Sequence, residues 1–328
     1  GILQHNRAHL RAVQNRSKEK SLKIAKDFGA DLSFDNYQDL VLDKGVDAVV
    51  VSSTPNVHFE QTKFALDHNK HVLIEKPMTF TVAQAEELCD LAMAKHLQLV
   101  VSCPWHYTPH GIQARKLIKE GVIGDLKMIS ILMTNPVDKL IKGINTSPTH
   151  GLNDVYVEPC PGSYSDPKVA GGGQVYTQVS HVGAYLNFLT GLDPTEVYAK
   201  FDFAGSQNDI YDVFTITLDK RVLVSLASTG ATPVSIRNFE VRVYGTLGIL
   251  LIELWKGSLA FYPFTGKPTI FPALAMDEVY PDRAPVTNFI DACLEIAPNG
   301  SPGKYGVAAM KIIEAATLSN KTGTVIKL

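Results

Sequence analysis

The chain has 328 residues, more than twice the usual size of a single domain, so we expect two domains. Hydrophobic residues make up 45% of the chain and charged residues 20%, which is ordinary for a protein that buries a full core. The formal net charge of −2 and the lack of a basic cluster with interleaved aromatic residues argue against nucleic-acid binding.

The cysteines and histidines indicate neither a disulfide framework nor a metal site. The ten histidines show no metal-ligand spacing, so we expect no metal. No apolar run approaches the roughly 20 residues of a membrane span, and the N-terminus does not have the shape of a signal peptide. We therefore expect a soluble cytoplasmic protein. The four cysteines are scattered, as is typical of reduced thiols: Cys89, Cys103, Cys160 and Cys293.

Short apolar runs alternate with helical patterns in the first third of the chain. Residues 46–52 form a continuous apolar run, which predicts a strand buried on both faces of a parallel sheet. A helical pattern at 57–69 and a strand at 71–74 come next. Thr81 then caps a helix in a capping box with Gln84, and residues after that helix form a third strand, 97–101. This alternation predicts a doubly wound parallel sheet with right-handed crossovers.

The pattern changes from about residue 126 onward. Longer alternating runs and tight connections are typical of antiparallel strands. Their ranges are 196–203, 209–219, 221–228, 239–244 and 248–254, with helical segments at about 174–190, 284–296 and 304–319. We therefore predict a dinucleotide-binding domain over residues 1–122. An α+β domain with a mostly antiparallel open sheet should cover 123–328, and its long loop of Pro, Gly, Ser and Asn at 135–173 is either functional or disordered.

Several motifs, in a fixed order, resemble those of the Gfo/Idh/MocA family (glucose–fructose oxidoreductase, inositol dehydrogenase, rhizopine catabolism). This resemblance implies a Rossmann-like domain followed by a mixed-sheet substrate domain. It also implies NAD or NADP as cofactor and a secondary alcohol of a sugar, sugar acid or cyclitol as substrate. The motifs are Thr54-Pro55-Asn56-Val57-His58, Lys70 through Glu75-Lys76-Pro77, Gly171-Gly172-Gly173, His181, Tyr244-Gly245-Thr246-Leu247-Gly248, and Lys311 to Leu328.

The start of the chain departs from this family. A Rossmann domain opens with a buried strand and a G-x-G-x-x-G turn at a helix N-terminus, where N–H groups meet the pyrophosphate. Neither is present in full, although Gly1 could be the last glycine and residues 6–13 resemble the helix after it. Residues 14–17 leave no room for the second strand, and 15–29 resembles the segment that comes after that strand. We expect two central strands to be missing because the sequence is incomplete there; a true truncation or divergent start is the alternative.

Two residues are the candidate catalysts. Lys76 follows a predicted parallel strand, at the end where ligands bind in open α/β sheets, and the alternative is a surface lysine. His181 aligns with the family's catalytic histidine, although a histidine beside an apolar stripe is often a core residue. The family usually has an aspartate four residues earlier, where this chain has Thr177, which cannot act as a base. We therefore expect Lys76 and His181 to carry the proton transfer.

The resemblance also implies residues for the cofactor and the substrate. The expected cofactor contacts are Thr54, Pro55, Asn56, His58, Glu75, Lys76 and Arg16. Arg16 hints at NADP, but a solvated arginine at a helix start is the alternative, as helix capping is for Asn56. The expected substrate contacts are Trp105, His106, Tyr107, Tyr164, Thr177 and Gln178, with interdomain packing as the alternative for the first three.

Three functions fit these residues. The first is an NAD(P)-dependent dehydrogenase or reductase that acts on CH–OH groups. The second is a glycosidase or lyase that retains its nicotinamide and cycles hydride internally. The third is a non-catalytic sugar- or nucleotide-sensing relative, which Thr177 and the incomplete start support. The resemblance also implies a homo-oligomer, either a dimer or a tetramer, because relatives bury the broad face of this open sheet, and the alternating residues 209–228 fit that role.

Overall fold

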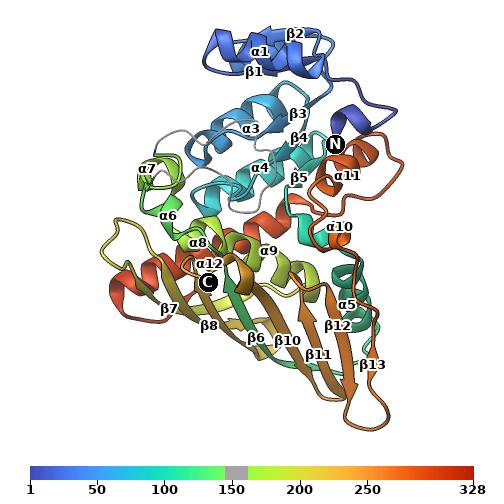
Figure 1. Cartoon of the computed structure of the whole chain (residues 1–328), viewed down its shortest axis with the longest axis vertical. Coiled ribbons are helices and arrows are strands. Elements are labelled where there is room, and N and C mark those ends of the chain that lie inside the picture. Colours follow the sequence, from blue (N-terminus) through green and yellow to red (C-terminus); the bar gives the residue numbers. More distant parts are fainter. Residues whose placement is uncertain (145–161) are drawn as a thin grey trace.

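The N-terminal domain consists of short parallel strands with helices between them (Figure 1). A computed structural model describes residues 1–144 and 162–328. β1 and β2 form one parallel pair, and β3, β4 and β5 form a separate parallel sheet. The elements in chain order are η1 (Ile2–Gln4), β1 (Ala12–Gln14), α1 (Lys18–Phe28), β2 (Leu32–Phe34), α2 (Tyr37–Leu42), β3 (Ala48–Val51), η2 (Pro55–Val57), α3 (His58–Asp67), β4 (His71–Ile74), α4 (Val82–Ala94), β5 (Leu99–Val101), η3 (Pro104–Tyr107) and α5 (Pro109–Lys119).

The structure differs from the sequence prediction at residues 6–13. These residues form no helix; the chain leaves η1 in turns and enters β1, where Val13 lies opposite Ser33 in the parallel pair. The expectation that the second strand has no room is therefore wrong, because β1 fills that position and α1 comes after it. A pairing between residues about 20 positions apart decides this, and no local periodicity encodes such a pairing.

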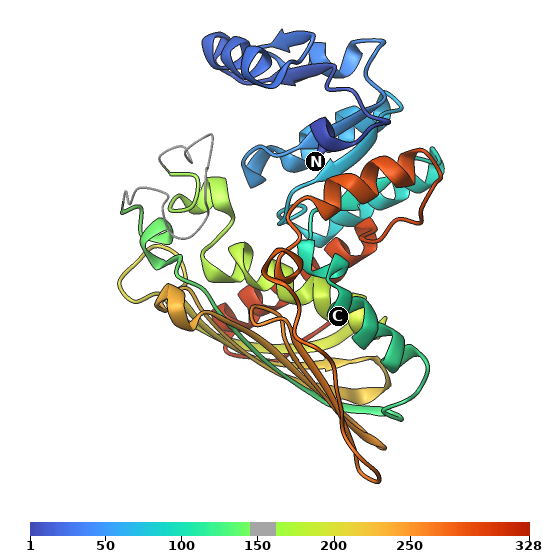
Figure 2. The same ribbon diagram turned by 45° about the vertical axis from the view of Figure 1, so that its right-hand side comes forward.

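The parallel sheet is divided between β1 and β3. Figures 1 and 2 show α1, β1 and β2 standing apart from the three-stranded sheet. A complete doubly wound sheet has the strand order 3-2-1-4-5-6. In that order β2 of this chain takes the place of the third strand, β1 that of the second, and β3 that of the fourth. Within the described residues, no strand lies at position 1. One central position, and not the two that we expected, is therefore without a strand.

This division exposes β3. The apolar run 46–52 predicts a strand buried on both faces, but Ala48 is exposed and Val50 keeps 37% of its surface accessible. Val51, at the end of the strand, is buried to 3%. The expectation for this strand is thus wrong, because β3 pairs only with β4 and forms an edge.

The C-terminal domain is built on one large open sheet. The strand order is β13-β12-β11-β10-β6-β9-β8-β7-β14, and all described pairs are antiparallel except β6 with β9. The prediction of a mostly antiparallel open sheet is therefore confirmed. Its strands are β6 (Leu126–Thr134), β7 (Pro194–Asp202), β8 (Tyr211–Leu218), β9 (Val222–Thr229), β10 (Asn238–Gly245), β11 (Gly248–Glu253), β12 (Ser258–Pro263), β13 (Thr269–Ile270) and β14 (Ile326–Lys327).

Helices cover one face of this sheet and join it to the first domain (Figures 1 and 2). α12 packs on α9 and β7 and also on α4 of the first domain. Gly183 permits the close crossing of α9 and α12, because a Cβ there would lie 2.7 Å from the Cα of Ala309. The helices of this domain are α6 (Asp138–Ile141), α7 (Pro167–Ala170), α8 (Gln174–Thr177), α9 (Val179–Thr190), η4 (Asp219–Arg221), η5 (Val234–Ile236), α10 (Met276–Val279), α11 (Ala284–Cys293) and α12 (Gly303–Thr322).

Candidate functional site

The candidate site lies in a large cleft beside the carboxyl ends of β3 and β4. The cleft has a volume of about 1420 Å³ and runs between the β1–β2 pair and the three-stranded sheet. Its walls bring together all of the cofactor candidates, including Lys76, and two of the substrate candidates, Tyr164 and Thr177 of the second domain. The cleft is thus where the two domains contribute side chains to one space.

Lys76 links the two domains inside this cleft. It comes directly after β4, and its peptide bond to Pro77 is cis. Its Nζ donates a hydrogen bond to the backbone carbonyl of Thr177, at 2.9 Å. Burial lowers the pKa of Lys76, while the neighbouring Glu75 acts against this shift. The lysine therefore projects from the first domain onto the end of α8.

His181 is buried behind this lysine. It lies in the first turns of α9, is only 5% exposed, and its Nδ1 has no hydrogen-bond partner. Burial lowers the pKa of His181 well below its usual value, and the charge of Lys76 lowers it further. The imidazole is therefore neutral near pH 7. The ring of Trp105 contacts it edge to face, with centroids 5.0 Å apart.

The helical segment predicted at 174–190 is interrupted at Gln178. α8 ends there and α9 begins, because the backbone of Gln178 has a φ of −119°. Thr177 uses its hydroxyl to bond the carbonyl of Gly173 at 2.8 Å, and it is its backbone oxygen, not its side chain, that accepts from Lys76. Gln178 accepts a hydrogen bond from the amide of Asn135 at 2.6 Å. The polar side chains of Thr177 and Gln178 are therefore both held by hydrogen bonds to residues of the second domain.

The cofactor candidates gather along the ends of β1, β3 and β4. Thr54 donates to the side chain of Asn56 at 2.7 Å within the turn that carries Pro55. His58 is buried, and its ring nitrogens lie 2.9 Å from the carbonyl of Pro77 and 3.0 Å from that of Ser53. His58 thus ties the two strand-end loops together. Arg16 is exposed at the end of β1 and lines the same cleft.

Four of the six substrate candidates lie outside the lining of this cleft: Trp105, which is 2% exposed, His106, Tyr107 and Gln178. His106 is 2% exposed, stacks on Phe188 at 4.7 Å and places Nδ1 2.8 Å from Ser301, and burial lowers its pKa to about 3. Tyr107 donates to Asn288 of α11 at 3.1 Å. Both residues therefore take part in interdomain packing, which was the alternative interpretation, because η3 turns them away from the cleft.

Other aromatic residues join Trp105 instead. Its ring contacts Trp255 at 5.2 Å and Tyr280 at 5.1 Å, and these two rings stack on one another. Tyr280 also lies close enough to Glu75 for that carboxylate to contribute to the raised pKa of the phenol, after burial. Sequence reasoning missed both residues. They come from connections after β11 and α10, and no spacing relates them to Lys76.

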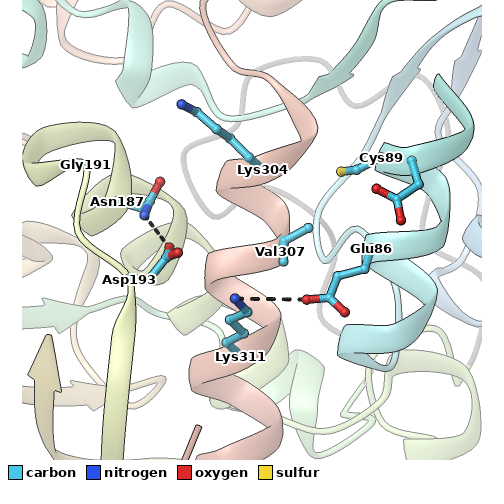
Figure 3. A pocket seen from close by; sticks show the side chains of 9 residues that line it. Glu86, Cys89, Asn187, Gly191, Asp193, Lys304, Val307 and Lys311 are labelled. Atoms are coloured by element: carbon cyan, nitrogen blue, oxygen red, sulfur yellow. Dashed lines mark hydrogen bonds and ion pairs between the residues drawn. The ribbon is translucent and has the colours of Figure 1, made fainter. Parts of the chain in front are cut away.

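A second cavity lies between α4, α12 and the turn after α9 (Figure 3). It has a volume of about 490 Å³ and contains none of the predicted site residues. Its charged groups are largely paired within it: Lys311 lies 4.0 Å from Glu86, and Asn187 donates to Asp193 at 3.0 Å. In the described part of the chain, no group of three or more His, Cys, Asp or Glu residues could hold a metal ion.

The chain matches two family models in succession. Residues 2–103 match the oxidoreductase family with an NAD-binding Rossmann fold, and residues 112–251 match the GFO/IDH/MocA C-terminal domain. The protein belongs to the GFO/IDH/MocA oxidoreductase family. Its N-terminal part is therefore an NAD-binding Rossmann domain, and the family relationship supports an NAD(P)-dependent dehydrogenase.

Several members of this family are similar to the chain over different lengths. An oxidoreductase of Synechocystis is 26% identical over 312 residues, which cover 88% of this chain and 79% of that protein. The NADP-dependent D-xylose 1-dehydrogenase of Hypocrea jecorina is 31% identical over 165 residues, half of this chain and 39% of that protein. None of the described helices is long and apolar enough to cross a membrane.

Solved structures of the family share the fold. An oxidoreductase domain protein from Kribbella flavida superposes with a TM-score of 0.82 at 20% identity, covering 98% of this chain and 90% of that one. A levoglucosan dehydrogenase in complex with NADH and levoglucosan gives a TM-score of 0.80 at 16% identity, with the same coverage. At such low sequence identity, these superpositions show a shared fold and nothing further.

The cleft fits only part of a dinucleotide. The turns after β3 and β4 present Thr54, Asn56, Glu75 and Lys76 to the space where a nicotinamide and its ribose would lie. Within residues 1–144 and 162–328, however, no strand is followed by a glycine-rich turn that opens a helix, as a pyrophosphate cradle requires. The turns after β3 and β4 thus line the cleft with polar side chains, whereas the described residues supply no cradle for phosphates.

Proposed function

We propose that this protein transfers a hydride between NAD or NADP and a secondary alcohol or ketone of a sugar, sugar acid or cyclitol. The observation that carries this proposal is the hydrogen bond from Lys76 Nζ to the backbone oxygen of Thr177, 2.9 Å long, at the end of α8. His181 is buried close enough for the charge of Lys76 to lower its pKa. When bound, the nicotinamide supplies or accepts the hydride. The residues of this chain then have to bind the carbinol and move its proton.

Lys76 has the chemistry to stabilise a developing alkoxide. Its ammonium donates one N–H to the carbonyl of Thr177 and has two further N–H groups that can donate to a substrate oxygen. His181 is neutral and its buried Nδ1 has no hydrogen-bond partner, so in this proposal it exchanges a proton with the neighbouring Lys76. Tyr164 lines the cleft beside Glu75 and has a pKa raised by burial, so it would donate a hydrogen bond to the substrate.

A binding protein without catalysis is the second candidate. The observation in its favour is that Thr177 replaces a carboxylate while its hydroxyl is already committed to Gly173. A sensor of this kind would bind a sugar or nucleotide but would not change the redox state of added nicotinamide.

The experiment is a titration of nucleotide-stripped protein with NADH and with NADPH, followed by energy transfer from tryptophan to the nicotinamide. A panel of sugars, sugar acids and cyclitols is then screened with the preferred cofactor. Saturable binding together with turnover of one substrate class supports the dehydrogenase. Binding without turnover across the panel favours the sensor, and no binding of either nucleotide by the full chain contradicts the dehydrogenase.

We also propose that the chain forms a homo-oligomer through the outer face of its large sheet. In the described part of the chain, no helix covers this face (Figure 2). Several apolar side chains on its strands are exposed. A contiguous patch of this kind typically marks an interface. The exposed residues are Met128, Leu132, Tyr211, Val213, Leu223 and Tyr262.

A further inference from the structure

Two carboxyl groups are buried next to the helix that holds Lys76. Asp209, just before β8, is 3% exposed, and Asp212, the second residue of β8, is 2% exposed. Each side chain influences the protonation of the other through a direct contact between them. Two carboxylates that close cannot both be ionised without a large cost in a buried site.

Asp209 holds the N-terminal end of α8. Its Oδ1 accepts the N–H of Gly173 at 2.9 Å, its Oδ2 accepts the N–H of Val175 at 2.7 Å, and its backbone oxygen accepts the N–H of Gln174 at 3.0 Å. A Cβ on Gly173 would lie 2.0 Å from the backbone oxygen of Asp209, so only glycine permits this approach. Three consecutive amides are thus fixed on one residue, and the two that reach its carboxyl group, those of Gly173 and Val175, favour its ionised form against the effect of burial.

Asp212 has no donor of its own. Neither of its oxygens receives an N–H or O–H from a neighbour, although both are buried. Burial first, and then the charge of Asp209, raise the pKa of Asp212 to about 10. Two buried oxygens without a donor favour the protonated form of Asp212, and such a proton would be available to the neighbouring Asp209.

The same short helix reaches the site. Thr177 N–H bonds to the carbonyl of Gly173 at 2.9 Å, so the single turn of α8 connects the capped end to Thr177. The carbonyl of Thr177 accepts from Lys76 Nζ at 2.9 Å. A shift at Gly173 would therefore displace the oxygen that orients the lysine.

We propose that Asp209 and Asp212 share one proton and act as positioning residues, clamping α8 so that the Thr177 carbonyl holds Lys76 in its working orientation. The effect on catalysis rests on the proposed hydride transfer; the clamp itself does not. Asp209 supplies the negative charge that binds the amides. Asp212 supplies a proton that can be donated to the Asp209 carboxylate. This donor stabilises the negative charge of Asp209 in the interior, where no cation among the described residues is paired with it.

The test compares Asp212→Asn with Asp212→Ala. Asparagine keeps an N–H that can donate to Asp209, whereas alanine leaves the Asp209 carboxylate without that donor. We expect Asp212→Asn to keep kcat close to that of the unaltered enzyme. Asp212→Ala should lower kcat by about 10–100-fold, the range in which small misplacements of a reacting group operate, with little change in the Kd for NADH.

A second readout separates this inference from the proposed function. Lysines of the folded protein are dimethylated with 13C-formaldehyde, and the Lys76 signal is assigned by its loss in Lys76→Arg. We expect the chemical shift and titration of Lys76 to change in Asp212→Ala and to be unchanged in Asp212→Asn, whether or not any substrate is turned over. Equal shifts in both variants, or none in a folded Asp212→Ala, would overturn the clamp. If the Lys76 signal changes in Asp212→Ala but not in Asp212→Asn, and no substrate is turned over, the clamp stands and the proposed dehydrogenase activity is contradicted.

Discussion

Lys76 of the first domain donates a hydrogen bond to the backbone carbonyl of Thr177 in the second domain, across 101 positions of sequence. The partner of the lysine is a main-chain oxygen, and the threonine side chain is engaged elsewhere. The orientation of Lys76 therefore depends on the backbone of α8 more than on the identity of residue 177. This explains how the chain can hold a site lysine without a carboxylate at that position.

Removing Lys76 should therefore matter far more than altering Thr177. We expect Lys76→Ala to lower kcat/KM by about 10²-fold or more, because the alkoxide loses its cation and proton partner. Thr177→Ala keeps the carbonyl, so it should lower kcat/KM by less than about tenfold. Steady-state kinetics with the substrate from the screen would measure both. A Thr177→Ala loss as large as that of Lys76→Ala would show that the hydroxyl has a role of its own.

The buried neutral His181 should make the fold sensitive to acid. Its pKa is lowered in the folded state, so below about pH 6.5 the unfolded chain takes up a proton that the folded chain refuses. The stability contributed by neutral His181 is thus present above that pH and is lost as the pH falls. In His181→Gln this loss is absent, so going from about pH 7 to pH 5 should shift the stability difference by about 2 kcal/mol in favour of the variant.

Urea unfolding of both proteins at several pH values measures this shift. A pH-independent difference between His181→Gln and the unaltered protein would contradict the buried neutral state. The same variant should lower kcat/KM by about 10²-fold if the imidazole transfers a proton.

The exposed edge of β3 predicts an unequal response of two neighbouring valines. Val50→Ala should change the free energy of unfolding by about 0.5 kcal/mol or less, because that side chain already meets solvent. Val51→Ala deletes buried methyl groups and should cost about 1–3 kcal/mol. Chemical denaturation of the two variants gives the comparison directly. Similar large losses at both positions would mean that this edge is covered in solution.

Arg16 tests the choice of nucleotide. If this exposed guanidinium meets a 2′-phosphate, Arg16→Ala should weaken NADPH binding by about tenfold and leave NADH binding unchanged. Lys26→Ala, which removes an exposed charge at the far end of α1, is the matched control. Equal NADPH affinity in Arg16→Ala and the unaltered protein would contradict a contact between Arg16 and the 2′-phosphate.

The outer sheet face tests the oligomer. Val213→Lys combined with Leu223→Lys introduces two charges into the exposed apolar patch and should shift the assembly toward monomer in light scattering after size exclusion. Met93→Lys, a similarly exposed change on α4, should not. A monomeric unaltered protein at all concentrations would contradict the predicted homo-oligomer.

Local pattern determined a large part of this protein. The strands at 71–74 and 97–101, the Thr81 cap of α4 and the alternating strands of the second domain arise from periodicity and capping, which act within a few residues. The family motifs led to Lys76 and His181 in the same way, because strand ends and helix starts are local features.

Only the tertiary structure decided the remaining features. Ala12–Gln14 becomes a strand by pairing with β2, and β3 becomes an edge because no described strand lies beside it. Burial sets the pKa of His181, and contact with Tyr280 and Trp255 completes the aromatic wall around Trp105. Pairing, desolvation and packing depend on residues far apart in the chain, and sequence spacing does not encode them.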